Sequence, residues 1–201
     1  IGFDGASWSR LAGGGGGDVC VIWVASATEA FAVGDGGVIL HRSGATWEPM
    51  ASGTIGLLSA VWGSAPDDVF AVGYLGVPLH YDGAAWGAMP IATPLQLPND
   101  LWGSAGDDVF AVGLAGEIAH YDGVSWTRMH SGSTQMLSAV WGRAGDDVFA
   151  VGAQGTVLHY DGVSWRALAS PTTDDLYDVG GSATEVYVLP PGRRVLRLPT
   201  P

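Results

Sequence analysis

Short apolar runs recur along the whole chain, separated by short links of Gly, Asp, Ser and Ala. A run such as Val148-Phe-Ala-Val151 is apolar at successive positions, which is typical of strands covered on both faces of their sheet. The links carry Gly and Asp, residues that suit tight turns. In the best-defined stretch the expected strands are Leu137–Gly142, Val148–Gly152, Thr156–Tyr160 and Ser164–Leu168. The pattern predicts an all-β protein of small, four-stranded antiparallel sheets.

The strand pattern repeats along the chain. Three segments, beginning at Val61, Leu101 and Val140, align without gaps and share the ending Asp-Asp-Val-Phe-Ala-Val-Gly. Each leads into His-Tyr-Asp-Gly-x-x-Trp, and weaker copies surround Trp23 and Val179. The first-strand positions are 23, 62, 102, 141 and 179, which gives steps of 39, 40, 39 and 38 residues. Four strands in a repeat of this length predict five blades of a β-propeller.

The two ends of the chain predict how the ring closes. A second Trp follows the first in four copies, at Trp47, Trp86, Trp126 and Trp165, but the last copy lacks it. Phe3–Trp8 matches Tyr160–Trp165 position for position. We therefore expect the N-terminal strand to complete the last blade, leaving no long unpaired edge. The prediction is one domain, 1–201, with blades at about 18–50, 57–89, 97–129, 136–168, and 175–201 together with 1–11.

Two phrases resemble a known repeat type. Phe31-Ala-Val-Gly-Asp-Gly-Gly-Val-Ile-Leu-His41 and the Asp-Gly-x-Ser-Trp endings resemble bacterial propeller repeats of the Ycf48-like and Asp-box (BNR, sialidase-type) families. The resemblance covers essentially the whole chain. It departs from the Asp-box pattern because His, not Ser or Thr, stands two residues before the Asp. The resemblance implies a propeller fold without implying an activity, and a secreted or extracytoplasmic bacterial location.

Charge and composition narrow the classes of function. A net charge of −12 and a pI near 4.4 argue against a nucleic-acid partner, whose phosphates require a basic face. No apolar run approaches the roughly 18 residues that a membrane span needs. The single Cys20 excludes an internal disulfide and a Cys-rich metal site, and we expect it to be buried. The Gly-rich runs lack the Lys-Ser/Thr of a phosphate loop, so no nucleotide site is predicted.

Two sets of repeated polar residues invite a chemical interpretation. Four His recur at one third-strand position, at His41, His80, His120 and His159, and the repeat places Arg197 there in the last copy. That position lies away from the propeller axis, so we expect a hydrogen bond to a neighbouring strand and not a metal site. We expect the Asp-Asp pairs of the first turns, and the Asp of each Tyr-Asp-Gly turn, to accept hydrogen bonds from turn amides. No catalytic residue, metal or cofactor is predicted, although the acidic turns of one face could attract cations or a basic partner.

The second turns and the connections between blades vary most among the copies, and they share the opposite face. Loops on a rigid scaffold are the usual place for function. The residues there that the repeat does not explain are the candidate ligand-binding set: Asp35, Tyr74, Asn99, Asp100, Glu117, His130, Gln135, Gln154, Arg193 and Arg194.

Three functions remain open. The first is a monomeric, non-enzymatic binding or scaffold propeller that engages a protein or an extracellular ligand through the variable loops. The second is a lectin, which requires similar pockets in several blades, although Tyr74 is the one aromatic residue of the variable second turns. The third is a glycosidase, which needs two carboxylates about 5–10 Å apart in a pocket. Drift in unconstrained loops would produce the same variability.

Overall fold

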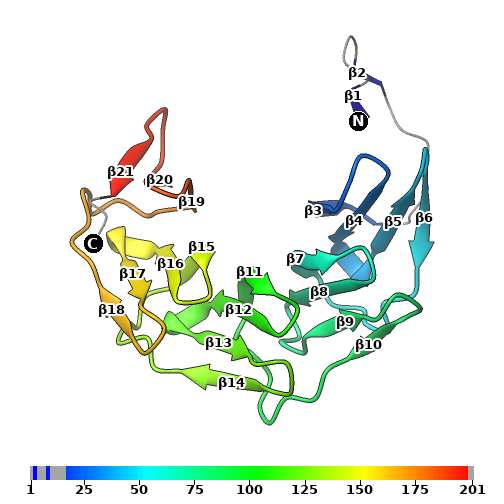
Figure 1. Ribbon diagram of the computed structural model, residues 1–201, viewed down its shortest axis with the longest axis horizontal. Coiled ribbons are helices and arrows are strands. Elements are labelled where there is room, and N and C mark those ends of the chain that lie inside the picture. Colours follow the sequence, from blue (N-terminus) through cyan, green and yellow to red (C-terminus); the bar gives the residue numbers. More distant parts are fainter. Residues whose placement is uncertain (1, 4–7, 10–16, 199–201) are drawn as a thin grey trace.

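A computed structural model describes residues 2–3, 8–9 and 17–198 and shows five antiparallel sheets arranged side by side around an arc (Figure 1). The first four sheets have four strands each, in sequential order. Blade 1 comprises β3 (Val19–Val24), β4 (Glu29–Gly34), β5 (Ile39–Ser43) and β6 (Thr46–Met50). Blade 2 comprises β7 (Leu58–Ala65), β8 (Asp68–Gly73), β9 (Leu79–Tyr81) and β10 (Trp86–Ala88).

The later blades follow the same plan. Blade 3 comprises β11 (Pro98–Ala105), β12 (Asp108–Gly113), β13 (Ile118–Tyr121) and β14 (Trp126–Met129). Blade 4 comprises β15 (Leu137–Ala144), β16 (Asp147–Gly152), β17 (Val157–Tyr160) and β18 (Trp165–Ala167). Blade 5 has three strands, β19 (Asp178–Gly181), β20 (Val186–Leu189) and β21 (Leu196–Leu198). The helices of the described residues are three single 3-10 turns, η1 (Asp35–Gly37), η2 (Leu114–Gly116) and η3 (Ala153–Gly155), and none is long enough to cross a membrane.

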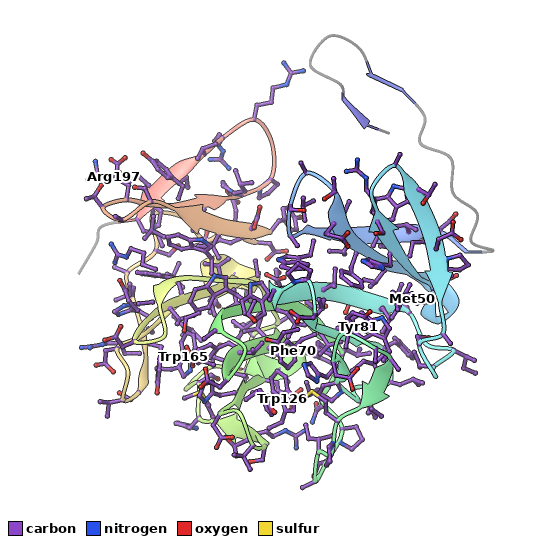
Figure 2. The ribbon with its side chains drawn as sticks, turned by 45° about the vertical axis from the view of Figure 1, so that its right-hand side comes forward. Met50, Phe70, Tyr81, Trp126, Trp165 and Arg197 are labelled. Atoms are coloured by element: carbon purple, nitrogen blue, oxygen red, sulfur yellow. The ribbon has the colours of Figure 1, made fainter. Side chains whose placement is uncertain are left out.

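The core consists of apolar layers between neighbouring blades. Along the second strand, Val69 and Ala71 face blade 1, whereas Phe70 and Val72 face blade 3. Both faces are covered, as the sequence pattern predicts. Aromatic rings join the blades: the centroid of Phe70 lies 5.6 Å from that of Tyr121 in the next blade. Figure 2 labels Phe70 together with Tyr81, Trp126 and Trp165, which fill equivalent layers.

The Trp-Gly pair in the first strands of blades 2 to 4 has a packing explanation. A Cβ atom added to Gly103 would lie 2.6 Å from the ring of Trp62 in the preceding blade, and Gly142 stands in the same relation to Trp102. The indole ring of one blade therefore lies on the glycine of the next. In this way one dipeptide specifies both sides of an inter-blade contact.

Blade 5 differs from the predicted alignment by one residue. Gly180 pairs with Tyr187, as Trp62 pairs with Phe70, so Gly180 takes the repeating first-strand position that the sequence assigns to Val179. The first hairpin of blade 5 is one residue shorter, and without Trp the sequence offered no marker for the register. Arg197 pairs with Tyr187 as His80 pairs with Phe70, so its predicted place at the His position is confirmed.

Ring closure by the N-terminal strand is not shown. β1 (Gly2–Phe3) pairs with β2 (Trp8–Ser9), and blade 5 keeps three strands. Phe3 pairs with Trp8 as Tyr160 pairs with Trp165, so β1 and β2 have the register of the third and fourth strands of a blade. β2 therefore pairs with β1, and not with β21, the third strand of blade 5. In Figure 1 the arc is open between blade 5 and blade 1. Closure of the five blades into a ring stays a prediction.

The open ends of the arc leave apolar side chains uncovered. Ile22 of blade 1 is 54% exposed, whereas its equivalent Val140 in blade 4 is 4% exposed. At the other end, Tyr187 and Leu189 of blade 5 are 37% and 39% exposed. The expectation that Cys20 is buried is wrong: it is exposed on β3, an edge strand of its sheet whose back face no described blade covers.

Candidate functional site

The propeller has two faces of different character. The turn face carries the first and third turns of each blade, between strands one and two and between strands three and four. The loop face carries the second turns and the connections between blades. The predicted candidate residues belong to the loop face, so we describe the turn face first and then ask what distinguishes the loop face from it.

An acid–base pair recurs on the turn face in all five blades. In blades 2 and 3, His80 and His120 contact Asp68 and Asp108 through Nε2 at 2.6 Å. The equivalent pairs are Glu29–His41 at 2.7 Å, Asp147–His159 at 2.8 Å and Glu185–Arg197 at 3.3 Å. Each pair joins the second strand to the third, so the predicted structural role of the His is confirmed.

In blades 2 to 4 the carboxylate that contacts the His binds a second side chain through its other oxygen. Ser64 and Ser104 donate hydrogen bonds to Asp68 and Asp108, and in blade 4 the guanidinium of Arg143 replaces the Ser, 2.6 Å from Asp147. These carboxylates therefore bind side chains and not the turn amides that the sequence suggested. Because each Ser bonds the carboxylate and not the imidazole, this arrangement provides no Ser–His pair for nucleophilic catalysis.

The Asp of each Tyr-Asp-Gly turn does accept turn amides, as predicted. Asp82 accepts hydrogen bonds from the N–H groups of Ala85 at 2.9 Å and Ala84 at 3.0 Å, and Asp122 and Asp161 do the same in their blades. These backbone donors hold the pKa of each carboxyl below its usual range. These three acids thus stabilise the turns. The first Asp of each Asp-Asp pair, Asp67, Asp107 and Asp146, accepts no hydrogen bond from another described residue, so the prediction that these pairs accept turn amides is wrong. No cluster of three metal-ligating groups occurs within the described ranges.

The backbone of the loop face is held rigidly by close contacts. Gly116 has φ +74°, and a Cβ atom there would lie 2.1 Å from the carbonyl oxygen of Ser133. Gly155 has φ +69° and lies as closely against Thr172. Ser131 Oγ then accepts from the N–H of Ser133 at 3.1 Å, which fixes the connection itself. In blades 1 to 4 a glycine of the second turn therefore packs against the following connection, and these loops are parts of the scaffold.

Three of the ten predicted residues are used by the fold. Asn99 Nδ2 donates to the carbonyl oxygen of Leu137 in the next blade at 2.8 Å. Asp100 Oδ2 accepts from the N–H of Val140 at 2.9 Å, also in the next blade. Glu117 contacts Arg128 Nε at 2.5 Å and accepts from the N–H of Gln96, which fastens the long connection between blades 2 and 3.

Burial changes the acidity of Asp100. Desolvation raises its pKa to about 7, against the lowering effect of the two N–H groups of Val140 and Leu101. The nearby charge of Asp178 acts in the same direction as desolvation. Since both oxygens serve as acceptors, this carboxyl holds two blades together and is not free to act on a ligand.

The remaining predicted residues lie on the loop face without forming one cluster of contacts. Asp35, Tyr74, Gln154 and Arg193 are exposed, and Arg194 Nη2 donates to Asp174 at 2.6 Å. In the connection between blades 3 and 4, His130 is exposed and Gln135 is half-buried. The structure brings Tyr74 and Asn99 together in one pocket, between blades 2 and 3.

An exposed apolar rim marks the loop face and was missed in the sequence. In blades 1, 2 and 4 the residue after the second strand donates to the residue before the first: Tyr74 N donates to Leu57 O at 2.8 Å, and Ala153 N donates to Met136 O at 2.9 Å. In blade 3, Leu114 N donates at 3.0 Å to the carbonyl oxygen of Gln96, the residue before Leu97. We call the exposed apolar residues at these two positions in blades 2 to 4 the loop-face rim. Its members are Leu57 (36% exposed), Tyr74 (64%), Leu97 (37%), Leu114 (40%) and Met136 (40%).

The sequence held a weak signal for this rim. Blade 1 carries Asp18 and Asp35 at the two positions, whereas blades 2 to 4 carry large apolar residues there, with the small Ala153 as the exception. An internal comparison restricted to these positions would have shown the difference. The signal is weak because large apolar residues are most often buried, so an apolar residue next to a strand indicates core before it indicates an exposed rim.

Part of the rim forms a pocket with a strained backbone. The pocket has a volume of about 160 Å³ and is lined by Leu57, Ser59, Tyr74, Leu97, Pro98 and Asn99. Leu97 has φ +45°, whereas the equivalent residues Leu57 and Met136 do not have positive φ. A positive φ is unusual for a bulky residue and costs about 1–3 kcal/mol. Such outliers concentrate at binding sites, which makes this pocket the best candidate site of the loop face.

Comparisons with known proteins support the fold. No family model and no curated protein matches the chain. It is similar to a solved structure described as YCF48 bound to D1 peptide, with 16% identity and a TM-score of 0.68 over 89% of this chain and 62% of that one. It is also similar to YCF48 from Cyanidioschyzon merolae, with 15% identity and a TM-score of 0.71 over 90% of this chain and 69% of that one. The chain thus spans less than two thirds of the first of these proteins, and the likeness shows a β-propeller fold.

Proposed function

We propose that the protein is a non-enzymatic β-propeller that binds a polypeptide segment through its loop face. The observation that carries the proposal is the apolar loop-face rim, whose five members are 36–64% exposed on braced loops. Exposed apolar side chains that gather on one surface are typical of protein-interaction sites. A rigid scaffold also lowers the entropy that binding must overcome. We further propose that the chain acts as one monomeric domain.

The YCF48 neighbour supports this choice of ligand class, because it is a propeller of the same fold described as bound to a peptide. The lectin alternative would require similar pockets in several blades, and Tyr74 is the one aromatic side chain of the rim. The glycosidase alternative ranks lowest, because the loop-face carboxylates Asp100 and Glu117 are engaged by backbone N–H groups and by Arg128.

A display experiment tests the proposed function. The intact chain is immobilised and screened against a random peptide library, and in parallel against a glycan array with calcium and with a chelator. We expect peptides to be enriched that compete with one another for a single surface. Enrichment of glycans without any peptide would overturn the proposal in favour of the lectin.

A further inference from the structure

The loop-face rim changes character along the arc. In blades 2 to 4 the rim positions are mostly apolar, whereas blade 1 carries Asp18 and Asp35 there. Asp35 N donates to Asp18 O at 2.8 Å, in the same way as Tyr74 N donates to Leu57 O at 2.8 Å, so the two acids of blade 1 occupy the positions that Tyr74 and Leu57 hold in blade 2. Both acids are exposed, and Asp35 uses Oδ1 to accept from the N–H of Gly36. An apolar stretch therefore ends in a negatively charged one.

The pocket between blades 2 and 3 has the size of one aliphatic side chain. Its volume of about 160 Å³ equals the share of roughly five water molecules at ~30 Å³ each. Leu57, Tyr74 and Leu97 provide apolar walls. Because Asn99 donates through Nδ2 to Leu137, its Oδ1 is left to accept, and no hydrogen bond to this oxygen occurs among the described residues. The pocket can thus take an apolar side chain while Asn99 accepts a main-chain N–H beside it.

The strained backbone of Leu97 gives independent evidence. Leu97 precedes Pro98, and a residue before proline favours extended backbone, yet Leu97 has φ +45°. Neither the fold of blade 2 nor that of blade 4 needs this conformation, because Leu57 and Met136 occupy the equivalent place without positive φ. The unusual conformation holds the Leu97 side chain at the wall of the pocket.

Resting on the proposed function, we infer that the partner is an extended polypeptide segment with one aliphatic side chain and one basic side chain. The aliphatic side chain enters the pocket of Leu57, Tyr74 and Leu97. The basic side chain lies over Asp18 and Asp35. Electrostatic attraction of this kind fixes direction and raises the association rate more than it raises affinity, and it weakens with salt.

A synthetic peptide array tests the inference on the intact chain. One Leu is moved along an Ala/Ser background, and either Lys or Glu is placed at each remaining position in turn. We expect peptides with both Leu and Lys to bind at least tenfold more tightly than the matched Leu and Glu peptides. Raising the salt from 0.05 to 0.5 M should reduce this preference, because the acids are exposed.

Variants then separate the parts of the site. Leu57→Ser and Tyr74→Ala should each weaken the best peptide at least tenfold, whereas Asp18→Asn with Asp35→Asn should abolish the Lys preference and keep the need for Leu. Val124→Ser, an 86% exposed position on the turn face, is the matched control and should bind as the wild type does. Thermal melts of every variant show that the loss of binding is not a loss of folding.

The outcomes are distinct. If no peptide of the array or of the display library binds, the proposed function fails together with the inference. If peptides bind but are insensitive to Leu57→Ser and Tyr74→Ala, or if Lys and Glu peptides bind equally, the proposed function stands and the inference is overturned.

Discussion

The two faces of this propeller use their residues differently. On the turn face the second Asp of each Asp-Asp pair and the Asp of each Tyr-Asp-Gly turn have partners in their own blade: Asp108 contacts His120 at 2.6 Å, and Asp122 accepts from two turn amides. On the loop face the backbone is braced, but the rim side chains are exposed. The turn face repeats because every blade needs the same bonds to fold. The loop face varies because its side chains are left available, and this is where a ligand can be recognised.

The largest expected effect concerns Asp100, the one loop-face acid that holds two blades together. Its pKa is raised to about 7, so the folded state binds its proton more tightly than the unfolded state, whose Asp titrates near 4. Its stabilising contribution is complete below about pH 4 and is lost as the pH rises through about 7. Relative to Asp100→Asn, the free energy of unfolding should fall by up to ~4 kcal/mol over this window. Urea unfolding of both proteins between pH 4 and 8 measures this change. A difference in unfolding free energy that stays constant with pH would contradict the raised pKa of Asp100.

The comparison of faces predicts a contrast between two matched acids. Asp108→Ala on the turn face leaves His120 and Ser104 without their acceptor and should cost about 1–3 kcal/mol. Asp35→Ala on the loop face should change the free energy of unfolding by less than about 0.5 kcal/mol. Denaturant unfolding of both variants at pH 7 checks this, and equal losses would remove the distinction between the faces.

The open ends of the arc provide a second contrast. Val140→Ser at a buried position should cost about 1.5–3 kcal/mol, whereas Ile22→Ser at the equivalent but 54% exposed position should cost much less. Equal costs would mean that another blade covers Ile22 in solution.

Deleting residues 1–9 complements this test: ring closure through the N-terminal strand requires a large loss of stability, while the pairing of β2 with β1 implies a small one.

The smallest expected effect is a gain in stability on replacing Leu97. Leu97→Gly relieves a positive φ that glycine adopts freely, offset by the entropy of the more flexible unfolded chain, and should stabilise the fold by up to ~1 kcal/mol. The same change should weaken peptide binding, since the pocket loses a wall. If Leu97→Gly destabilises the protein, the strain is not stored at this residue.

The sequence predicted the parts of the molecule that repeat. The blade plan, the place of Arg197 and the structural role of His80 and its equivalents followed from period and pattern. The register of blade 5 did not, because Gly180 stands where the other blades carry Trp. The pocket was out of reach for another reason: Leu57 and Leu97 are far apart in sequence, and nothing in a lone Leu distinguishes an exposed rim from a core. Some of the polar residues that the sequence predicted as ligand-binding, such as Asp100, hold neighbouring blades together.

The central claim is that the loop-face rim, and not the turn face, receives a polypeptide. Hydrogen exchange with mass spectrometry, with and without a saturating library-selected peptide, tests it most directly. Bound peptide should slow exchange at 54–58, 74–76 and 95–99 and leave 80–86, 120–126 and 159–165 unchanged. Protection confined to the second group of segments, on the turn face, would contradict the claim.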